Sequence, residues 1–258
     1  MKSALLNRVN IFRLDMSFLN KAGLLLWSLM IIFYKRLRLK IPPIKIFLKK
    51  TGTNAIIYDG TDLATLMEIF LYEEYKIPND RIVNRILDLG ANTGYTSLYF
   101  ASIFKQAEIV SVEPDLENID KISNNTKELS ARIIVEPSAV AASTGKINFY
   151  RNFKTSISGS TVLRDKMAEM ISVPALTLTD LEKKYGSFDL VKFDIEGGEW
   201  EAILPDGLTH QPDLWIGEYH EDLVKKPSSD FAKRFTGYEY IFQKIAKNRS
   251  IVIFKKQQ

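Results

Sequence analysis

The stretch Ile86-Leu87-Asp88-Leu89-Gly90-Ala91-Asn92-Thr93-Gly94, continued by Tyr-Thr-Ser-Leu-Tyr-Phe to residue 100, decides the fold class of this chain. The apolar run from Ile86 to Leu89 predicts a buried strand, and Gly90 and Gly94 predict a tight turn. The apolar residues that follow are spaced for one buried face of a helix. Strand, glycine turn and helix are typical of an α/β sheet with a ligand crevice beyond the carboxyl ends of its strands, because glycine lets the backbone approach a ligand and the helix N-terminus offers free N–H groups.

The turn does not fit the dinucleotide-binding pattern G-x-G-x-x-G, because its middle position is Asn92 and its last glycine comes too early. Asn tolerates positive φ, so we still expect a sharp turn. Asp88, directly before the turn, suits a ligand with an amino group better than a pyrophosphate, since two anions would face each other. Glu113 ends the next predicted strand, where a carboxylate can accept hydrogen bonds from both hydroxyls of a ribose. An amine and a ribose together describe S-adenosylmethionine better than NAD.

Composition excludes several classes of chemistry. The chain has 258 residues, which suffices for one α/β domain of about 200 residues and an appendage. It contains no cysteine, so disulfides, thiolate metal sites and thiol catalysis are excluded. Its two histidines, His210 and His220, do not suffice to predict a metal cluster, and we expect no bound metal.

Charge is divided unevenly along the chain. Residues 1–50 contain eleven Lys or Arg and one acid, a net charge of +10, whereas residues 51–258 carry a net charge of −6. The acidic body argues against a nucleic-acid partner, and it assigns any anionic partner to the N-terminus.

Residues 22–34 are almost wholly apolar and are followed by the basic segment 35–40. A helix of that length extends about 20 Å, which is less than the roughly 30 Å of a hydrocarbon core. Two interpretations stay open. The segment lies on a membrane surface with its cations on anionic head groups, or it packs on the larger domain or at a dimer contact. No signal-peptide cleavage site follows, so we expect a cytoplasmic protein with peripheral membrane contact, if any, through residues 22–50.

The chain is predicted to consist of an N-terminal extension, residues 1–50, and one domain, residues 51–258. In this domain strand-like and helix-like segments alternate, which predicts a doubly wound, mostly parallel sheet. The last two strands are close enough in sequence to form an antiparallel edge hairpin. Strands are predicted near 54–58, 85–89, 108–113, 132–136, 146–150, 188–194, 213–219, 237–243 and 249–255, and helices near 62–75, 94–105, 116–129, 177–185, 198–204 and 221–235. Asp62 is expected to cap the first of these helices.

A second group of polar residues follows the strand that runs through Leu190 to Phe193. Lys192 lies inside this strand, and a buried ammonium needs a carboxylate partner. Asp194 falls at the carboxyl end of the strand, Glu196 follows in the turn, and the next strand ends in Glu218-Tyr219-His220. The carboxyl ends of parallel strands meet at one edge, so we expect a reaction site there. A structural ion-pair network that caps the next helix is the competing interpretation, and His220 is equally consistent with a hydrogen-bonded wall residue.

With these motifs the chain resembles the FkbM family of S-adenosylmethionine-dependent methyltransferases. The resemblance rests on the Gly-Ala-Asn turn at 90–92 together with Lys192-x-Asp-x-Glu-Gly197, and it extends in order over residues 51–255. It implies a Rossmann-like class I methyltransferase sheet of seven strands with a final antiparallel strand. It also implies a cofactor site in which Asp88, Gly90, Ala91, Asn92 and Gly94 surround the methionine part, Glu113 holds the ribose, and Ser138 and Ala139 lie near the adenine.

The resemblance implies O-methylation of a hydroxyl on a sugar, glycan or natural product, with a small-molecule or glycan acceptor. The reaction is an in-line displacement in which a base takes the hydroxyl proton. Asp194 is the first choice for this base and His220 the second, while Lys192 and Glu196 orient Asp194 or bind the acceptor. Residues 155–161 are small and polar and fit either a substrate loop or a solvated connection. The alternative functions are a catalytically silent, membrane-associated binding module with the same fold and, less favoured by the glycine spacing, a nicotinamide oxidoreductase.

Overall fold

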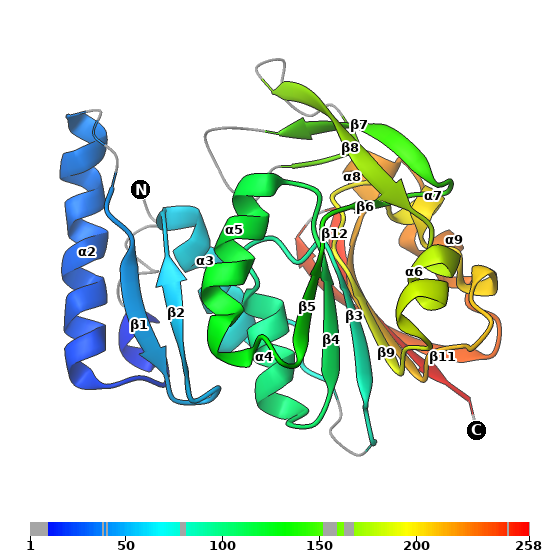
Figure 1. Cartoon of the computed structure of the whole chain (residues 1–258), viewed down its shortest axis with the longest axis horizontal. Helices are drawn as coiled ribbons and strands as arrows, with labels where there is room; N and C mark the ends of the chain where they lie inside the picture. The colour runs from blue at the N-terminus through cyan, green and yellow to red at the C-terminus, as the bar shows by residue number, and fades with distance from the viewer. Residues whose placement is uncertain are drawn as a thin grey trace.

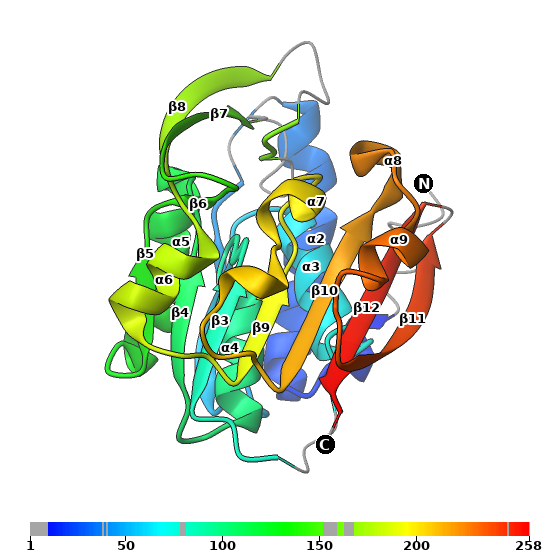
Figure 2. The same cartoon turned by 90° about the vertical axis from the view of Figure 1, so that its right-hand side faces the viewer.

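The computed structural model describes residues 10–37, 39, 41–77, 81–151, 159–162, 168–246 and 248–257. A seven-stranded sheet with the strand order β11-β12-β10-β9-β3-β4-β5 forms its centre (Figure 2). Strands β3, β4, β5, β9 and β10 of this sheet are parallel to one another, and β12 is antiparallel to both of its neighbours, β10 and β11. The strands are β3 (Arg85–Leu89), β4 (Glu108–Val112), β5 (Ile133–Glu136), β9 (Leu190–Phe193), β10 (Leu214–His220), β11 (Tyr238–Ala246) and β12 (Arg249–Lys256). The predicted sheet is confirmed, except that β12 lies inside the sheet and only β11 forms the edge.

Helices cover both faces of the sheet (Figure 1). On one face lie α3 (Gly60–Phe70), α4 (Tyr95–Ile103) and α5 (Leu116–Thr126), and on the other lie α6 (Leu178–Tyr185), α7 (Glu199–Ala202) and α9 (Ser228–Ala232). Successive strand residues point to opposite faces, so Ile86 packs in one hydrophobic cluster and Leu87 in the other. Because both faces are buried, the strands are continuous apolar runs rather than alternating ones.

Two predicted helices have different bounds in the structure. The helix expected at 221–235 is divided into α8 (Glu221–Val224) and α9, because Lys225 has a φ of 61° and Pro227 precedes α9. The first helix is capped by Asp59, whose carboxylate accepts the amide N–H groups of residues 61 and 62, and not by Asp62. It ends at Phe70, so that Glu74 and Tyr75 lie in the connection toward the carboxyl edge of the sheet. Short 3-10 turns occupy Ile11–Arg13, Lys127–Leu129 and Pro205–Gly207.

A three-stranded sheet lies beyond the carboxyl ends of the parallel strands (Figure 2). It consists of β6 (Ala139–Val140), β7 (Gly145–Arg151) and β8 (Glu169–Leu176) in the order β6-β8-β7. The strand predicted at 146–150 is therefore confirmed, while β8 was not predicted. Its sequence contains Pro174 and it is only partly buried, so neither its composition nor its pattern marked it as a strand.

The N-terminal extension packs on the domain through one face of its helix. Helix α2 (Phe18–Arg36) buries Leu24 and Trp27 in the same hydrophobic cluster as Ile46 of β1 (Ile44–Leu48). Strand β1, which was not predicted, pairs with β2 (Thr53–Ile57), so the predicted boundary at residue 50 falls in the turn of a hairpin. No helix in the described part of the chain is both long and apolar enough to cross a membrane.

Candidate active site

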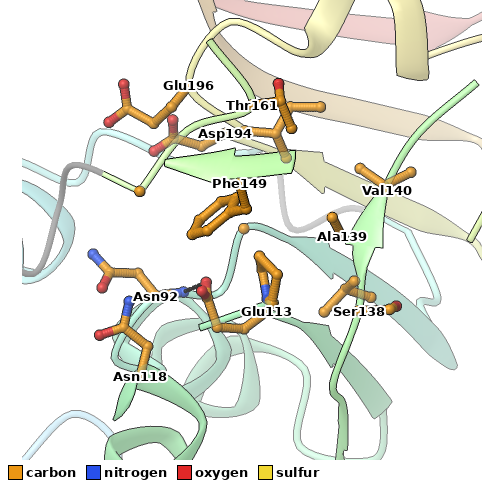
Figure 3. Close-up of a pocket in the computed structure, with 15 residues that line it drawn as sticks. Asn92, Glu113, Asn118, Ser138, Ala139, Val140, Phe149, Thr161, Asp194 and Glu196 are labelled. Carbon is orange, nitrogen blue, oxygen red and sulfur yellow. Dashed lines mark hydrogen bonds between the residues drawn. The ribbon is translucent and has the colours of Figure 1, made fainter. Parts of the chain in front are cut away.

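Two cavities of about 630 and 670 Å³ meet at the carboxyl edge of the sheet. The first extends toward β4, β6 and β7, and the second extends toward α3 and the connection that follows it. Figure 3 shows the first cavity, with Glu113 and Asn118 on one side and Asp194 and Glu196 on the other. Four residues line both cavities: Gly90, Asn92, Asp194 and Glu196. The turn after β3 and the turn after β9 thus form the boundary that the two cavities share.

Gly90 is required by a close approach of two backbone segments. Its φ is +72°, and a Cβ atom built on it would lie 1.9 Å from the backbone oxygen of Asp194. Any side chain at this position would therefore displace the turn after β9. Asn92 adopts the positive φ expected of it, 51°, which keeps the turn after β3 sharp. The first turn thereby presents bare main chain toward both cavities.

Glu113 lies at the end of β4 with its carboxylate buried against the same turn. One oxygen accepts the N–H of Asn92 at 3.0 Å and the other accepts the N–H of Asp115 at 3.0 Å. Burial raises the pKa of Glu113 to about 7, although these hydrogen bonds favour the ionised form and oppose the shift. The carboxylate therefore lines the first cavity in a fixed orientation, with remaining lone pairs for further donors.

Asp88 is not among the residues that line either cavity, and its place beside the methionine part of the cofactor stays a prediction. The side chain is fully buried and accepts hydrogen bonds from Thr96 and Ser97, at 2.6 and 2.7 Å. Its other oxygen lies 3.1 Å from Nζ of Lys192, which also donates to the carbonyl oxygens of Leu89 and Gly90. Lys192 therefore has the carboxylate partner that its position required. Its bonds to the two carbonyl oxygens hold the start of the turn after β3.

Replacing Lys192 by Met is expected to destabilise the protein by about 3–5 kcal/mol, because a buried carboxylate is left without its cation. Lys233→Met is the matched control, since Lys233 pairs with Asp230 at the surface, where the side chains are 74% and 46% exposed. Urea unfolding followed by circular dichroism measures both. A loss for Lys192→Met as small as that for the control, below about 1 kcal/mol, would contradict the structural role of the pair.

Asp194, Glu196 and His220 form a cluster at the boundary between the cavities. Oδ2 of Asp194 accepts the hydroxyl of Tyr75 at 3.1 Å. Nε2 of His220 lies 3.3 Å from Oε2 of Glu196 and 3.9 Å from Oδ1 of Asp194. Together with Tyr75 the cluster joins three segments far apart in the sequence, as the sequence predicted for residues 194, 196 and 220.

His220 is fully buried and is held from its other side by Glu199. Nδ1 of the imidazole lies 2.8 Å from Oε1 of Glu199, which is itself fully buried and also accepts the N–H of Gly197. Burial opposes a charge on His220, but the hydrogen bond to Glu199 and the surrounding carboxylates outweigh it and raise the pKa of His220 to about 10. The sequence assigned Glu199 only to the start of a helix, so its part in this cluster was missed.

Carboxyl groups are concentrated along the second cavity. Burial is the main reason that the pKa of Glu74 rises to about 7 and that of Glu218 to about 8, and neighbouring carboxylates raise both further. Glu68 has its pKa raised for the same reason. Arg249 pairs with Glu218 at 2.9 Å. The second cavity therefore has a strongly acidic wall that suits a cationic or hydroxyl-rich ligand.

The remaining predicted site residues divide between the cavities and the framework. Ser138 and Ala139 line the first cavity, and Ala91 lines the second. Gly94 contacts neither; it begins α4 with a φ of 86° and packs against Ile122 of α5. Residues 159–161 of the small polar segment are described, and two of them line the first cavity, whereas 155–158 lie outside the described residues. Site residues that the sequence did not identify are Tyr75 in the connection after α3, Asn118 in α5 and Phe149 in β7 of the added sheet.

Comparisons with known proteins give the family. Residues 88–238, more than half of the chain, match the methyltransferase FkbM domain. No curated protein matches the chain. Among solved structures, the chain is similar to a putative caffeoyl-CoA O-methyltransferase from Staphylococcus aureus, with 16% identity over 74% of this chain and 83% of that chain and a TM-score of 0.44.

Two further solved structures are similar to the same extent. The precorrin-6y C5,15-methyltransferase from Geobacter metallireducens has 12% identity over 70% of this chain and 84% of that chain, with a TM-score of 0.44. An SAH-bound methyltransferase from Podospora anserina has 14% identity over 75% of this chain and 88% of that chain, with a TM-score of 0.43. On the strength of the domain match and of the seven-stranded sheet, the chain belongs to the FkbM methyltransferase family, and its cofactor is S-adenosylmethionine.

Proposed function

We propose that the protein is an O-methyltransferase that acts on a hydroxyl of a sugar, a glycan or another hydroxyl-rich natural product. The observation that carries this proposal is the position of Asp194, whose side chain is 25% exposed and lines both cavities. One cavity then holds the methyl donor and the other the acceptor, and a carboxylate lies between them. The acidic wall of the second cavity can accept several hydroxyl hydrogen bonds, which favours a polyhydroxylated acceptor.

The first cavity fits S-adenosylmethionine. Glu113 has lone pairs directed into it for the two ribose hydroxyls, and the bare main chain at Gly90 leaves room beside it. Oγ of Ser138 is buried and has no hydrogen-bond partner among the described residues, so it is free to bond a heterocycle. The ring of Phe149 faces the same space (Figure 3). Glu113, Ser138 and Phe149 would therefore hold the nucleoside part.

When bound, S-adenosylmethionine supplies the methyl group: the acceptor oxygen forms the new O–C bond, the S–C bond breaks with its electron pair on sulfur, and the hydroxyl proton goes to a base. Asp194 is the base in this proposal, because it lies where the two ligands meet. Tyr75 donates to Oδ2 of Asp194 and fixes the orientation of its carboxylate. Lys192 bonds to Asp88 rather than to Asp194 and so supports the turn, and it also lines the second cavity, where the acceptor would bind.

The function is tested with S-adenosylmethionine carrying a labelled methyl group and a panel of sugars, glycans and phenols. Transfer of label to a hydroxyl of a polyhydroxylated acceptor is the expected outcome, and mass spectrometry locates the new methyl ether. Tight binding of the cofactor with no transfer to any acceptor in the panel would favour the catalytically silent binding module instead.

The affinity for S-adenosylmethionine is expected to rise with pH through neutrality. The free protein has a raised pKa at Glu113, about 7, so the carboxylate that accepts the ribose hydroxyls is largely protonated at pH 6 and ionised at pH 8. Binding that requires the ionised form is then about tenfold weaker at pH 6. Calorimetry should find wild type and Glu113→Gln similar at pH 6 and wild type about tenfold tighter at pH 8. Equal affinities at pH 8 would remove Glu113 from the cofactor site, and Glu117→Gln, an exposed neighbour, serves as the control.

We also propose that the outer face of α2 rests on an anionic membrane surface. The apolar side chains on this face are exposed, with Leu26 and Phe33 both at 61%, and α2 is the outermost element at the left of Figure 1. Residues 1–50 carry a net charge of +10, which complements anionic head groups rather than a second copy of the same basic extension.

Vesicle flotation tests this proposal with phosphatidylcholine vesicles that contain or lack phosphatidylserine. Wild type should float only with the anionic vesicles, and Leu26→Ser with Phe33→Ser should abolish flotation. Leu116→Ser, which changes a leucine of α5 that is 70% exposed, is the control and should float like wild type. Point variants are preferable to removal of residues 1–50, because β1 pairs with β2. If the wild-type protein is a dimer that binds no vesicles, and the α2 double variant is a monomer, the outer face of α2 contacts a second copy of the chain and not a membrane.

A further inference from the structure

We propose that Asp194, Glu196 and His220 bind a divalent metal ion at the boundary between the two cavities. One ligand atom of each residue, a carboxylate oxygen or an imidazole nitrogen, lies within 4.8 Å of the others. Nε2 of His220 is 3.3 Å from the Glu196 oxygen and 3.9 Å from the Asp194 oxygen. For bonds of about 2.1 Å, ligand atoms of one ion are separated by about 3.0 Å in an octahedron and about 3.4 Å in a tetrahedron. The His220–Glu196 separation matches that of two ligands of one ion, and the His220–Asp194 separation is about 0.5 to 0.9 Å too long, so Asp194 would have to move toward the ion.

Two of the atoms that face this point are buried and make no hydrogen bond within the described residues. His220 has no exposed surface, and its Nε2 makes no hydrogen bond within the described part of the chain. Oδ1 of Asp194 is also buried without a hydrogen bond there. Buried polar atoms of this kind call for an explanation, and an ion between them supplies the missing partner for both.

The imidazole is oriented as metal-binding histidines are. Glu199 holds Nδ1 of His220 at 2.8 Å, which fixes the ring and directs the Nε2 lone pair toward the two carboxylates once the ring is neutral. A carboxylate on the second ring nitrogen is the usual outer partner of a histidine ligand. Two carboxylates and one imidazole suit Mn²⁺ or Zn²⁺.

Among the described residues, Arg249 adds positive charge beside Asp194 and Glu196. Arg249 is paired with Glu218, and Lys192 is paired with Asp88. Glu218 places a further carboxylate oxygen 3.4 Å from Nε2 of His220, so a fourth ligand is within reach. Asp194 and Glu196 both line the second cavity, so an ion bound to them is open to an acceptor oxygen.

The use of the ion in catalysis rests on the proposed function, whereas its binding does not. An acceptor hydroxyl bound to the ion loses its proton more readily, because the positive charge stabilises the oxygen anion. Oδ1 of Asp194 would contact the ion, and Oδ2, the oxygen that bonds Tyr75, would take the proton. The acceptor oxygen would then take the methyl group as in the proposed reaction.

Binding of Mn²⁺ to the full chain, without cofactor or acceptor, tests the site. Titration followed by electron paramagnetic resonance should detect one bound Mn²⁺ per chain, displaced by Zn²⁺. Pulsed spectra should contain coupling to an imidazole nitrogen. His220→Gln should lose this coupling and bind Mn²⁺ at least about tenfold more weakly. His210→Gln changes the other histidine, which is 73% exposed and outside the cluster, and should leave both the coupling and the affinity unchanged.

Two further measurements keep the test decisive. Glu196→Gln changes a ligand that is 12% exposed, and it should weaken Mn²⁺ binding even if the His220 variant fails to fold. Absence of bound Mn²⁺, Mg²⁺ and Zn²⁺ at millimolar concentrations would overturn the proposal, as would nitrogen coupling that persists in His220→Gln. Methyl transfer at full rate after removal of all ions would refute the catalytic use of the ion and leave the proposed function standing. Bound Mn²⁺ with no methyl transfer to any acceptor would support the metal site and count against the proposed function.

Discussion

Replacing Asp194 by Asn is expected to lower the rate of methyl transfer by about 100-fold or more while the affinity for S-adenosylmethionine changes little. The amide keeps the size of the side chain but cannot take the hydroxyl proton, and it is a poor ligand for a cation. In the proposed arrangement the carboxylate is not required for cofactor binding, because the nucleoside would be held by Glu113 and Ser138, which line the first cavity. The rate is measured with labelled cofactor at saturation, and the affinity by calorimetry.

Asp213→Asn is the matched control for this variant. Asp213 immediately precedes β10, at the opposite edge of the sheet, and its side chain is 52% exposed beside Arg81. It should transfer methyl groups at the wild-type rate. If Asp194→Asn also transfers at nearly the wild-type rate, Asp194 is not the base.

Replacing Gly90 by Ala is expected to destabilise the protein by more than about 2 kcal/mol and to weaken cofactor binding at least tenfold. The new Cβ would lie 1.9 Å from the backbone oxygen of Asp194, so the turn after β9 has to move. That turn carries Asp194 and Glu196, which line both cavities, and its displacement changes the cofactor site and the acceptor site together. Thermal unfolding and calorimetry measure the two effects.

Gly52→Ala separates the close contact from the cost of the backbone conformation. Gly52 has a φ of +70°, nearly that of Gly90, but nothing lies within 4 Å of a Cβ built on it. This control should lose only about 1 kcal/mol, the cost of a side chain at positive φ. Equal losses of stability for the two alanine variants would mean that the close contact between residue 90 and the backbone of Asp194 does not contribute to the loss of stability.

The amino-acid sequence by itself determined the sheet and the position of the site along it. The apolar runs of β3, β4, β9 and β10 are long enough to be buried on both faces, and each is followed by polar residues at its carboxyl end. Such patterns are local, so they can be read without knowing any partner. The glycine turn at Gly90 and the family resemblance are equally local, and both are confirmed.

The strands that the sequence missed lack a local pattern. β8 contains Pro174 and is half exposed, and β1 lies in a basic segment whose pairing with β2 only the folded chain reveals. In the same way, α2 has apolar side chains on opposite sides, and its length alone did not decide which side is covered. Packing of Leu24 and Trp27 against the domain settled that question for one face.

Only the tertiary structure decided what each carboxylate contacts. Asp88 and Lys192 are 104 positions apart, and they become neighbours because β3 pairs with β9 in a register that places one beside the other. A shift of that register by one residue would separate the two side chains and leave Lys192 without its carboxylate partner. Glu199 likewise reaches His220 only when α7 and β10 are packed together. The sequence therefore determined which residues gather at the edge of the sheet, while register and packing determined which of them bind each other and which remain open to a ligand.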